Sequence, residues 1–424
     1  MTPEAGVRAS REHLRGGSPV DRVTMPAVPY PMSPIEVAWG WLPGGEIVAT
    51  PEEHRPAASA LEALEDAIRP ALLRPPCVVL FSGGRDSSLV LAAALRVARR
   101  EGIDEPVALT QRFPGVLEAR EDEWQEEVVR YLGVKHWERL ELTDELDILG
   151  PRATASLLRH GVVWPPLAHT HWVEIERARG GSLVDGEGGD EVLGAGRLAP
   201  LRDLVRGRRW SRQVIRLTAL SVSPRAIRRA ALGRDTRRQL ALGWLTPGPR
   251  RELERAIAAD GAAEPADWRR AVTRQARLRG VHLAMAGMAA LAAEEGASMF
   301  HPLLDHRVTA ALARAGGIFG FADRTSAMRE LFGDLLPDSL LSRTTKARFN
   351  HVVFHDHCRE FVSGWTGAGA DPDLVDAEAL AAHWHQPQVH ALTFALLQGC
   401  WLAERGPREQ SGSSIGVLAR GTDR

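Results

Sequence analysis

The feature of this chain that most limits its fold is an apolar run followed at once by a small, polar turn and a long helical pattern. The run from Cys77 to Phe81 is typical of a buried parallel strand, and the Ala- and Leu-rich stretch that ends near Arg100 is typical of a helix. Between them stands the turn Ser82-Gly83-Gly84-Arg85-Asp86-Ser87-Ser88. A strand-to-helix turn offers free backbone N–H groups at the positive end of the helix dipole, and its glycines let an anion approach the main chain. The sequence therefore predicts a phosphate-binding loop.

This loop is not a Walker P-loop, because the Gly-x-x-x-x-Gly-Lys-Ser/Thr pattern is absent and no lysine follows the glycines. It resembles the Ser-Gly-Gly-x-Asp-Ser signature of the ATP-pyrophosphatase (PP-loop) family. The resemblance implies that the loop holds the β- and γ-phosphates of ATP while the α-phosphate is attacked. The alternative is that the glycines make only a tight strand-to-helix turn.

The order of patterns along the chain predicts an α/β fold. After the loop come strand Pro106–Thr110, helix Glu118–Leu132, strand Lys135–Leu142, helix Thr143–His160, helix Leu167–Arg179 and strand Ser182–Asp185. Such alternation is typical of a doubly wound, mainly parallel sheet, in which ligands bind at the carboxyl ends of the strands. From Arg197 onward strand patterns nearly vanish, so the second half should be mostly α-helical.

These patterns divide the chain into four parts. The parts are an N-terminal extension (1–56), an ATP-pyrophosphatase α/β core (57–196), a mostly helical remainder of the synthetase domain (197–409) and a tail (410–424). The extension is rich in proline and glycine and contains a short strand or hairpin around Ile35–Leu42. The core begins with an amphipathic helix over Ala57–Leu73, and the Ser- and Gly-rich tail is expected to be disordered.

The composition fits a globular protein of two or three domains, with 424 residues, a net charge of −1 and 44% hydrophobic residues. No apolar run approaches the roughly 18 residues of a membrane helix, and the N-terminus lacks the pattern of a secretion signal. We therefore expect a soluble, cytoplasmic protein. Cys77, Cys358 and Cys400 are far apart and form no Cys-x-x-Cys pair, so neither a disulfide framework nor structural zinc is indicated.

A second glycine-rich turn carries the other carboxylates that a metal–triphosphate site needs. It reads Asp185-Gly186-Glu187-Gly188-Gly189-Asp190-Glu191. Mg²⁺ prefers hard oxygen ligands, and proteins hold it with one or two carboxylates together with substrate phosphates. Asp86 and Asp190, at the ends of separate strands, therefore predict a shared Mg²⁺ site. Taken alone, the second turn would be equally compatible with a solvated loop.

Four motifs, in order, resemble the synthetase domain of asparagine synthetase-like proteins. After the PP-loop, the segment from Asp185 to Gly194 resembles Ser-Gly-Glu-Gly-x-Asp-Glu-x-x-Gly, with Asp185 in place of the serine. The segment Phe300-His301-Pro302-Leu303-Leu304-Asp305 resembles Arg-x-Pro-Phe-Leu-Asp. Leu336 to Phe349 resembles Leu-Pro…Arg-x-Lys-x-x-Phe, and the whole resemblance covers roughly residues 73–365.

The resemblance implies a reaction in two steps. A substrate carboxylate attacks the α-phosphorus of ATP and releases pyrophosphate, and an amine then opens the acyl-adenylate to give an amide. The implied ATP- and pyrophosphate-binding residues are Leu80, Ser82, Gly83, Gly84, Asp86, Ser87, Ser88, Thr110 and Gly186, with Asp86 and Asp190 as Mg²⁺ ligands. The implied catalytic residues are Lys346, which would stabilise charge on the α-phosphate, and Glu187, which would orient the amine or accept its proton. Otherwise Lys346 is a surface residue and Glu187 a structural one.

Departures from the family bear on the substrate. The second residue is Thr2 and the phosphate loop already begins at Ser82, so no N-terminal glutaminase domain is expected. The amine would then come from free ammonia, from a partner protein or from the substrate itself, and the last option resembles β-lactam synthetases and lasso-peptide macrolactam cyclases. Phe300 and Leu303 stand where the family has arginine and phenylalanine, which argues against aspartate as the substrate.

We therefore expect an amide ligase of peptide or small-metabolite biosynthesis that acts on a peptide or small-molecule carboxylate, for example in macrolactam formation. A partner protein could present the peptide or supply the amine, and no membrane or nucleic-acid partner is expected. The alternatives are an ammonia-dependent asparagine synthetase, a catalytically silent nucleotide-binding scaffold and a PP-loop enzyme that modifies tRNA.

Three further groups of residues leave alternatives open. The arginine-rich segment 202–238 suits an acidic peptide, a nucleic acid or solvated helix faces, and its single aromatic residue, Trp210, argues against base stacking. His169 and His171 are candidates for substrate contact. The residues His351, His355, His357 and Cys358 have a spacing that suits either a metal or polar packing.

Overall fold

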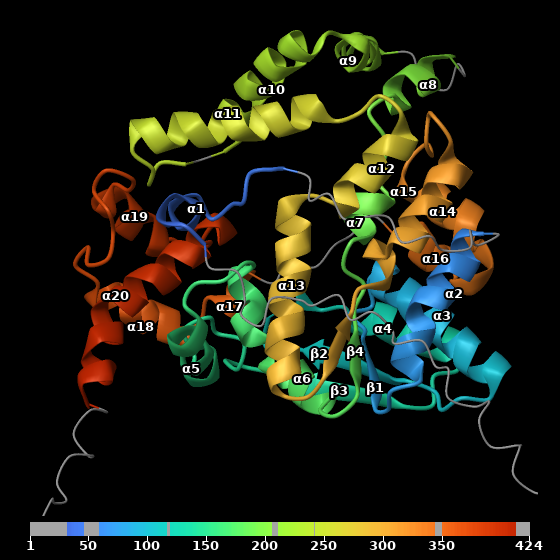
Figure 1. The fold of residues 1–424 in the computed structure, drawn as a ribbon, viewed down its shortest axis with the longest axis horizontal. Helices are drawn as coiled ribbons and strands as arrows, with labels where there is room; N and C mark the ends of the chain where they lie inside the picture. The colour runs from blue at the N-terminus through green and yellow to red at the C-terminus, as the bar shows by residue number, and fades with distance from the viewer. Residues whose placement is uncertain are drawn as a thin grey trace, which may run out of the picture.

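A five-stranded parallel sheet forms the centre of the computed structural model (Figure 1), which describes residues 32–45, 59–116, 119–205, 211–240, 242–343 and 350–412. The strands are β1 (Cys77–Leu80), β2 (Val107–Arg112), β3 (Trp137–Glu141), β4 (Ser182–Val184) and β5 (Ser298–Phe300). They are ordered β3-β2-β1-β4-β5, and each neighbouring pair is parallel. The predicted doubly wound α/β core is confirmed.

Helices cover both faces of this sheet and build the rest of the molecule. The first half contains α1 (Pro34–Trp39), α2 (Ala60–Leu72), α3 (Arg85–Glu101), α4 (Asp122–Leu132), α5 (Pro151–His160), the 3-10 helix η2 (Pro166–Thr170), α6 (Trp172–Arg177) and α7 (Gly189–Val192). The second half contains α8 (Ala199–Val205), α9 (Arg212–Val222), α10 (Arg225–Gln239), α11 (Pro247–Ala263), α12 (Trp268–Ala276), α13 (Arg279–Glu294), η3 (Pro302–Leu304), α14 (His306–Gly316), α15 (Arg324–Phe332), η4 (Gly333–Leu335), α16 (Asp338–Leu341), α17 (Asn350–Val353), α18 (Asp356–Gly364), α19 (Ala377–Trp384), η5 (Ala391–Thr393) and α20 (Phe394–Gly412).

The two faces of the sheet bury alternate side chains, because successive residues of a strand point to opposite faces. In β1, Val79 belongs to the core that contains α2 and α3, whereas Val78 belongs to the core that contains α6 and α13. Each central strand is therefore apolar on both faces, which accounts for the continuous apolar run from Cys77 to Phe81. No helix among the described residues is long and apolar enough to cross a bilayer.

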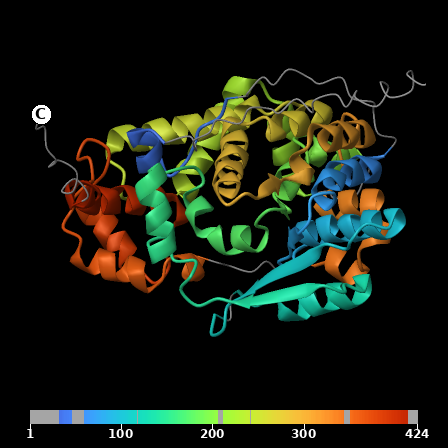
Figure 2. The same cartoon turned by 60° about the horizontal axis from the view of Figure 1, so that its bottom comes forward.

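The helical half surrounds the core on two sides. The C-terminal helices α18 to α20 gather at one end of the molecule and α2 to α4 at the other (Figures 1 and 2). Helices α9, α10 and α11 run across the top in Figure 1, at the side away from β3. The mostly helical second half is thus as predicted, apart from the short edge strand β5, whose three residues are too few to show a strand pattern.

The predicted strand or hairpin around Ile35–Leu42 is wrong, because this segment contains helix α1. Ser33 and Glu36 form a reciprocal capping box, and Pro34 takes the first helical position. Gly40 ends the helix with φ +57°. These start and stop signals outweigh the β-branched and aromatic residues that suggested a strand. The remainder of the predicted extension, 1–31 and 46–56, lies outside the described residues.

Three other boundaries differ from the sequence predictions. The helix expected over Thr143–His160 begins only at Pro151, because Gly150 is its N-cap and proline is favoured at the first position. The helix expected over Leu167–Arg179 is divided into η2 and α6. Helix α20 runs to Gly412, so it includes the first residues of the predicted tail, and residues 413–424 lie outside the described part.

Candidate active site

The turns that follow β1 and β4 meet at the carboxyl edge of the sheet. These strands are neighbours, and the winding of the chain reverses between them, which is where open α/β sheets form a ligand crevice. A Cβ atom on Gly186 would lie 2.7 Å from the main-chain nitrogen of Ser87, and one on Gly189 would lie 2.1 Å from Cγ of Asp86. Glycine at both positions therefore permits the close approach of the two turns.

The predicted pyrophosphate-binding residues form one compact loop. The hydroxyl oxygens of Ser82 and Ser87 are 3.0 Å apart, and Ser87 Oγ donates to the carbonyl oxygen of Gly84 at 3.2 Å. Gly83 has φ +83°, a left-handed conformation that favours glycine. Gly84 is the N-cap of α3 and offers no side chain to its first N–H groups. Ser88 Oγ is buried and has no hydrogen-bond partner within the described ranges. The N-terminus of α3 thus retains donors for an anion.

The two predicted metal ligands meet at one cation, the guanidinium group of Arg324. Its Nη2 pairs with Asp86 and its Nη1 pairs with Asp190. Asp86 Oδ1 is buried and has no hydrogen-bond partner among the described residues, and burial raises the pKa of Asp86 although Arg324 opposes the shift. Two carboxylates that already hold a cation, with one oxygen still unsatisfied, are a donor set that suits Mg²⁺. Arg324 was not predicted, because a single arginine at the start of a helix carries no motif.

A buried ion pair between Arg343 and Glu121 contacts the main chain of the glycine loop that follows β1. Arg343 Nη2 lies 2.5 Å from an oxygen of Glu121, and its guanidinium lies 5.0 Å from the centre of the Trp124 ring. Arg343 Nη1 also donates to the carbonyl oxygen of Gly83 at 3.3 Å. The arginine of the fourth motif therefore fixes the loop backbone. Lys346 lies outside the described residues, so its catalytic role stays a prediction.

Thr110 and Leu80, two of the predicted ATP-binding residues, differ from each other in exposure. Thr110 is fully buried, and its hydroxyl donates to the carbonyl oxygen of Phe81 and accepts from Nε1 of Trp137, both at 2.9 Å. Its side chain therefore joins the strand ends beneath the cleft and has no surface open to a nucleotide, which corrects that prediction. Leu80 is partly exposed at the end of β1. A hollow of about 260 Å³ opens beside the loop at the end of β2.

Glu187 belongs to a group of titratable residues at the ends of β4 and β5. Desolvation, together with the nearby carboxylates of Asp185 and Glu191, raises its pKa to about 7, and His171 and His301 partly oppose the shift. Its side chain keeps exposed surface, so a substrate can reach it. A carboxylate that titrates near neutral pH and is accessible is suited to accept or donate a proton.

An aspartate–histidine pair lies beside Glu187. His301 Nδ1 is 2.9 Å from an oxygen of Asp185, and His301 Nε2 is buried with no hydrogen-bond partner in the part of the chain that the structure describes. Burial alone would lower the pKa of His301, but Asp185 and Glu187 more than offset this and raise it. Asp185 also accepts from the main-chain nitrogen of Glu187 at 3.1 Å. The aspartate that replaces the family serine is thus coupled to a histidine of the third motif, a link that no local pattern reveals.

The two histidines after Pro166 have different surroundings. His169 is buried, with Nδ1 2.9 Å from Ser156 Oγ and Nε2 3.1 Å from the carbonyl oxygen of Gly161, and burial lowers its pKa to about 4. Its prediction as a substrate contact is therefore not supported. His171 Nδ1 lies 3.3 Å from an oxygen of Glu174, whose charge raises the pKa of His171 against the effect of burial.

The histidine and cysteine cluster near α18 packs around a buried aspartate. Cys358 Sγ lies 2.8 Å from Oδ1 of Asp147, and the main-chain nitrogens of His357 and Cys358 donate to Oδ2 at 2.9 and 3.2 Å. Within the described ranges, no group of three or more His, Cys, Asp or Glu residues is placed to hold a metal. Polar packing at the start of α18 accounts for these residues, although the side chain of His351 lies outside the described part.

A comparison with protein-family models matches residues 59–400 to the family described as asparagine synthase. The match includes the sheet, both turns at the carboxyl edge, and the positions of Arg324 and Arg343. No curated protein matches the chain.

We predict that Gly189→Ala weakens nucleotide binding, because the new Cβ would displace Asp86 from Arg324 and Asp190. The stabilisation of the melting temperature by ATP and Mg²⁺ should need roughly tenfold more ligand. Gly248→Ala is the matched control, since a Cβ at this exposed helical position meets nothing within 4 Å. Equal ligand requirements in the two variants would contradict the steric argument.

We predict that Asp185→Asn lowers the pKa of His301, because the largest attraction that opposes the effect of burial is then lost and only that of Glu187 remains. The pair of Asp185 with protonated His301 stabilises the fold fully below about pH 6.5, and this contribution is lost as the pH rises through the raised pKa of His301. The variant should therefore lack this contribution at low pH. An NMR titration of the histidine ring protons, assigned with His301→Gln, measures the shift, and the His169 signal serves as the internal control. An unchanged His301 titration would show that Asp185 does not hold the imidazolium.

Proposed function

The chain belongs to the asparagine synthase family, whose members are ATP-using amide ligases, and we propose that it is an Mg²⁺-dependent, AMP-forming ligase that adenylates a substrate carboxylate and joins it to an amine. The observation that carries this proposal is the convergence of Asp86 and Asp190 on one cation next to the glycine loop. A silent scaffold would have no need for two carboxylates from different turns at this point.

The glycine loop and the two carboxylates would bind different parts of the ATP–metal complex. The N–H groups at the start of α3 and the hydroxyls of Ser82 and Ser87 would bind the pyrophosphate. Asp86 and Asp190 would hold Mg²⁺, which neutralises charge on the leaving pyrophosphate. Arg324, which now lies between the carboxylates, marks the position where positive charge is favoured. Lys346 remains our candidate for the charge that develops at the α-phosphate.

The proposed reaction has two steps. A carboxylate oxygen of the substrate forms a bond to the α-phosphorus while the bond to the β-phosphate oxygen breaks, so pyrophosphate leaves and an acyl-adenylate remains. The amine next attacks the acyl carbon, AMP leaves, and the amine proton passes to Glu187. This role is supported by the raised pKa of Glu187 and by its accessible side chain, which let it act as a base just above neutral pH.

The substrate that we propose is a peptide or a small metabolite, with macrolactam formation as the leading case. The group around Glu187 combines the carboxylate of Asp185 with the imidazoles of His171 and His301, a mixture that suits an amine carried on a larger substrate. A partner protein that presents the peptide or supplies the amine belongs to the same proposal.

We predict that Asp86→Asn or Asp190→Asn lowers substrate-dependent exchange of labelled pyrophosphate into ATP by roughly a hundredfold or more, because one charge of the cation site is lost. The assay is run over a panel of carboxylic acids and peptides. Asp267→Asn is the control, since it removes the same charge from an exposed helix N-cap at which asparagine is equally favoured. Full exchange in the Asp86 and Asp190 variants would remove the metal assignment, and exchange with aspartate alone would indicate an asparagine synthetase.

We predict that Glu187→Gln keeps pyrophosphate exchange but slows amide formation with an ordinary amine. The wild-type amide-forming rate should rise as the pH passes about 7, where Glu187 becomes the carboxylate that can accept a proton. The variant should lack this rise. Hydroxylamine, which is nucleophilic without a base, should restore product in the variant. Loss of exchange and of the hydroxylamine product together would instead make Glu187 a residue of the first step.

A further inference from the structure

The arginine-rich segment 202–238 contains two groups of arginines with different surroundings. Arg202 and Arg228 are buried, and their guanidinium groups donate to the carbonyl oxygens of Gly320 at 2.7 Å and Ala262 at 2.6 Å. These two arginines hold helices together. A second group lines a hollow between α10 and α11 and consists of Arg225, Arg229 and Arg237.

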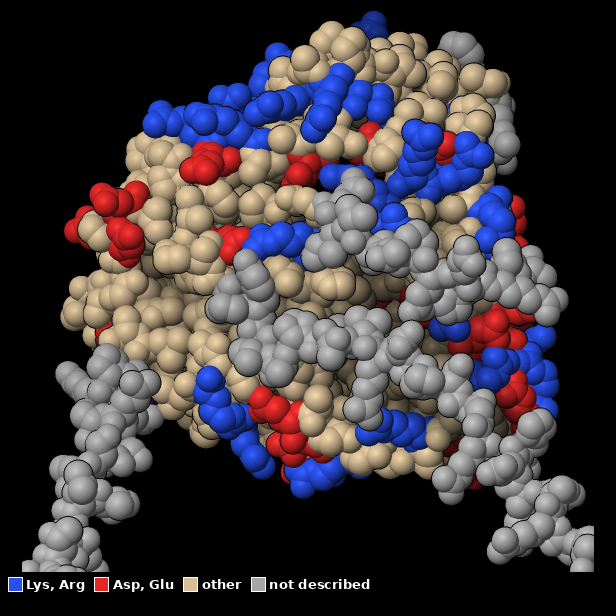
Figure 3. Space-filling view, viewed as in Figure 1, with Lys and Arg blue, Asp and Glu red and all other residues tan. Residues whose placement is uncertain are grey.

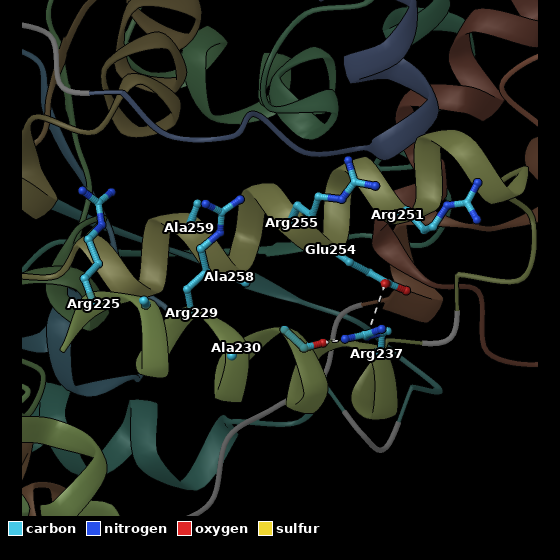
Figure 4. Close-up of a pocket in the computed structure, with 11 residues that line it drawn as sticks. Arg225, Arg229, Ala230, Arg237, Arg251, Glu254, Arg255, Ala258 and Ala259 are labelled. Atoms are coloured by element: carbon cyan, nitrogen blue, oxygen red, sulfur yellow. Dashed lines mark hydrogen bonds and ion pairs between the residues drawn. The ribbon is translucent and has the colours of Figure 1, made fainter. Parts of the chain in front are cut away.

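The hollow has a volume of about 820 Å³ and lies between two helices that run side by side (Figure 4). Helix α11 adds Arg251 and Arg255 to its rim. Its floor is made of alanines and a glycine, and Gly233 packs against Ala258. Arginine side chains form a band along this upper side of the molecule (Figure 3). A chain entering the hollow would therefore meet small residues below and cations at the sides.

Among the described residues, most of the positive charge that lines the hollow has no acidic partner. Glu254 is the one carboxylate in the lining, and it is shared by Arg237 at 3.7 Å and Arg250 at 3.2 Å. Within the part of the chain that the structure describes, four of the five lining arginines form no ion pair or hydrogen bond: Arg225, Arg229, Arg251 and Arg255. Their guanidinium groups are available to an anionic ligand.

The arginines are spaced for an extended ligand. Arg225, Arg229 and Arg237 all line the hollow from α10. From first to last they span about 18 Å at 1.5 Å per residue, the length of five or six residues of extended peptide. Arg251 and Arg255 form a second row, four residues apart, on α11.

The chemistry of the lining favours carboxylates. Guanidinium groups pair with carboxylates through two parallel hydrogen bonds, and among the described residues no aromatic side chain lines the hollow on which a base could stack. We propose that this hollow binds an acidic, extended segment of a peptide substrate. The choice of a peptide rests on the proposed function, because a peptide joined through one carboxyl group can present further carboxylates at a distance from the reacting one.

Direct binding without ATP tests the proposal. The probes are a fluorescein-labelled octapeptide of alternating Glu and Gly, the same peptide with Gln for Glu, and an eight-nucleotide RNA, each titrated with the full chain by fluorescence anisotropy. We expect the Glu peptide to bind more tightly than both others and to lose affinity between about 0.05 and 0.5 M salt. Equal binding of the Glu and Gln peptides, or tighter binding of the RNA, would overturn the proposal.

Paired variants locate the binding. Combined Arg229→Gln and Arg255→Gln should weaken the Glu peptide roughly fivefold or more, because two exposed charge pairs are lost. Combined Arg234→Gln and Arg238→Gln removes the same charge from exposed positions of α10 outside the hollow and should change the affinity less than about twofold. Equal losses in the two pairs would mean that only the overall charge matters.

The proposal of a ligase and the proposal of a peptide-binding hollow can be contradicted independently of each other. Peptide binding is measured without nucleotide, whereas pyrophosphate exchange needs only the site at the sheet edge. Intact exchange without peptide binding would remove the hollow from the mechanism and leave the ligase. Intact peptide binding with no exchange on any acid would remove the ligase and leave a peptide-binding protein.

Discussion

The site depends on how closely two turns can approach at the ends of adjacent parallel strands. β1 and β4 pair in register, so their carboxyl ends, and the turns that follow, are held at one edge. The main chain at Gly186 and Gly189 lies so near Ser87 and Asp86 that a Cβ atom would collide with them. Because of this contact, carboxylates from distant parts of the sequence reach the same cation.

The same edge shows how the protein manages charge at partly buried positions. Desolvation would favour the neutral form of Asp86, and Arg324 opposes this by pairing with both Asp86 and Asp190. At the ends of β4 and β5, Asp185 raises the pKa of His301, while Glu187, near other carboxylates, has its pKa raised to about 7. The pair of carboxylates around Arg324 and the titratable group around Glu187 therefore both lie at the carboxyl edge of the sheet, an arrangement compatible with the adenylation and amine attack that we propose.

How much of this could be predicted follows from the range of the interactions. The phosphate loop and the alternation of strands and helices were predictable because their signals lie within short stretches, such as the glycines after Phe81. The capping box of α1 was also local, but its strand-like residues concealed it. Arg324 and the pairing of Asp185 with His301 were not predictable, since each joins segments whose contact exists only after the sheet has formed.

The amino-acid order alone established the family, the parallel α/β core and the two turns that carry the carboxylates, because strand and turn preferences act between near neighbours. The tertiary structure decided which charged side chains contact one another. It buried Thr110 and His169 among packing partners, set His301 beside Asp185, and placed some arginines of the arginine-rich segment as buried donors and others around a cationic hollow. These outcomes depend on burial and on distances between remote residues, which neither composition nor spacing contains.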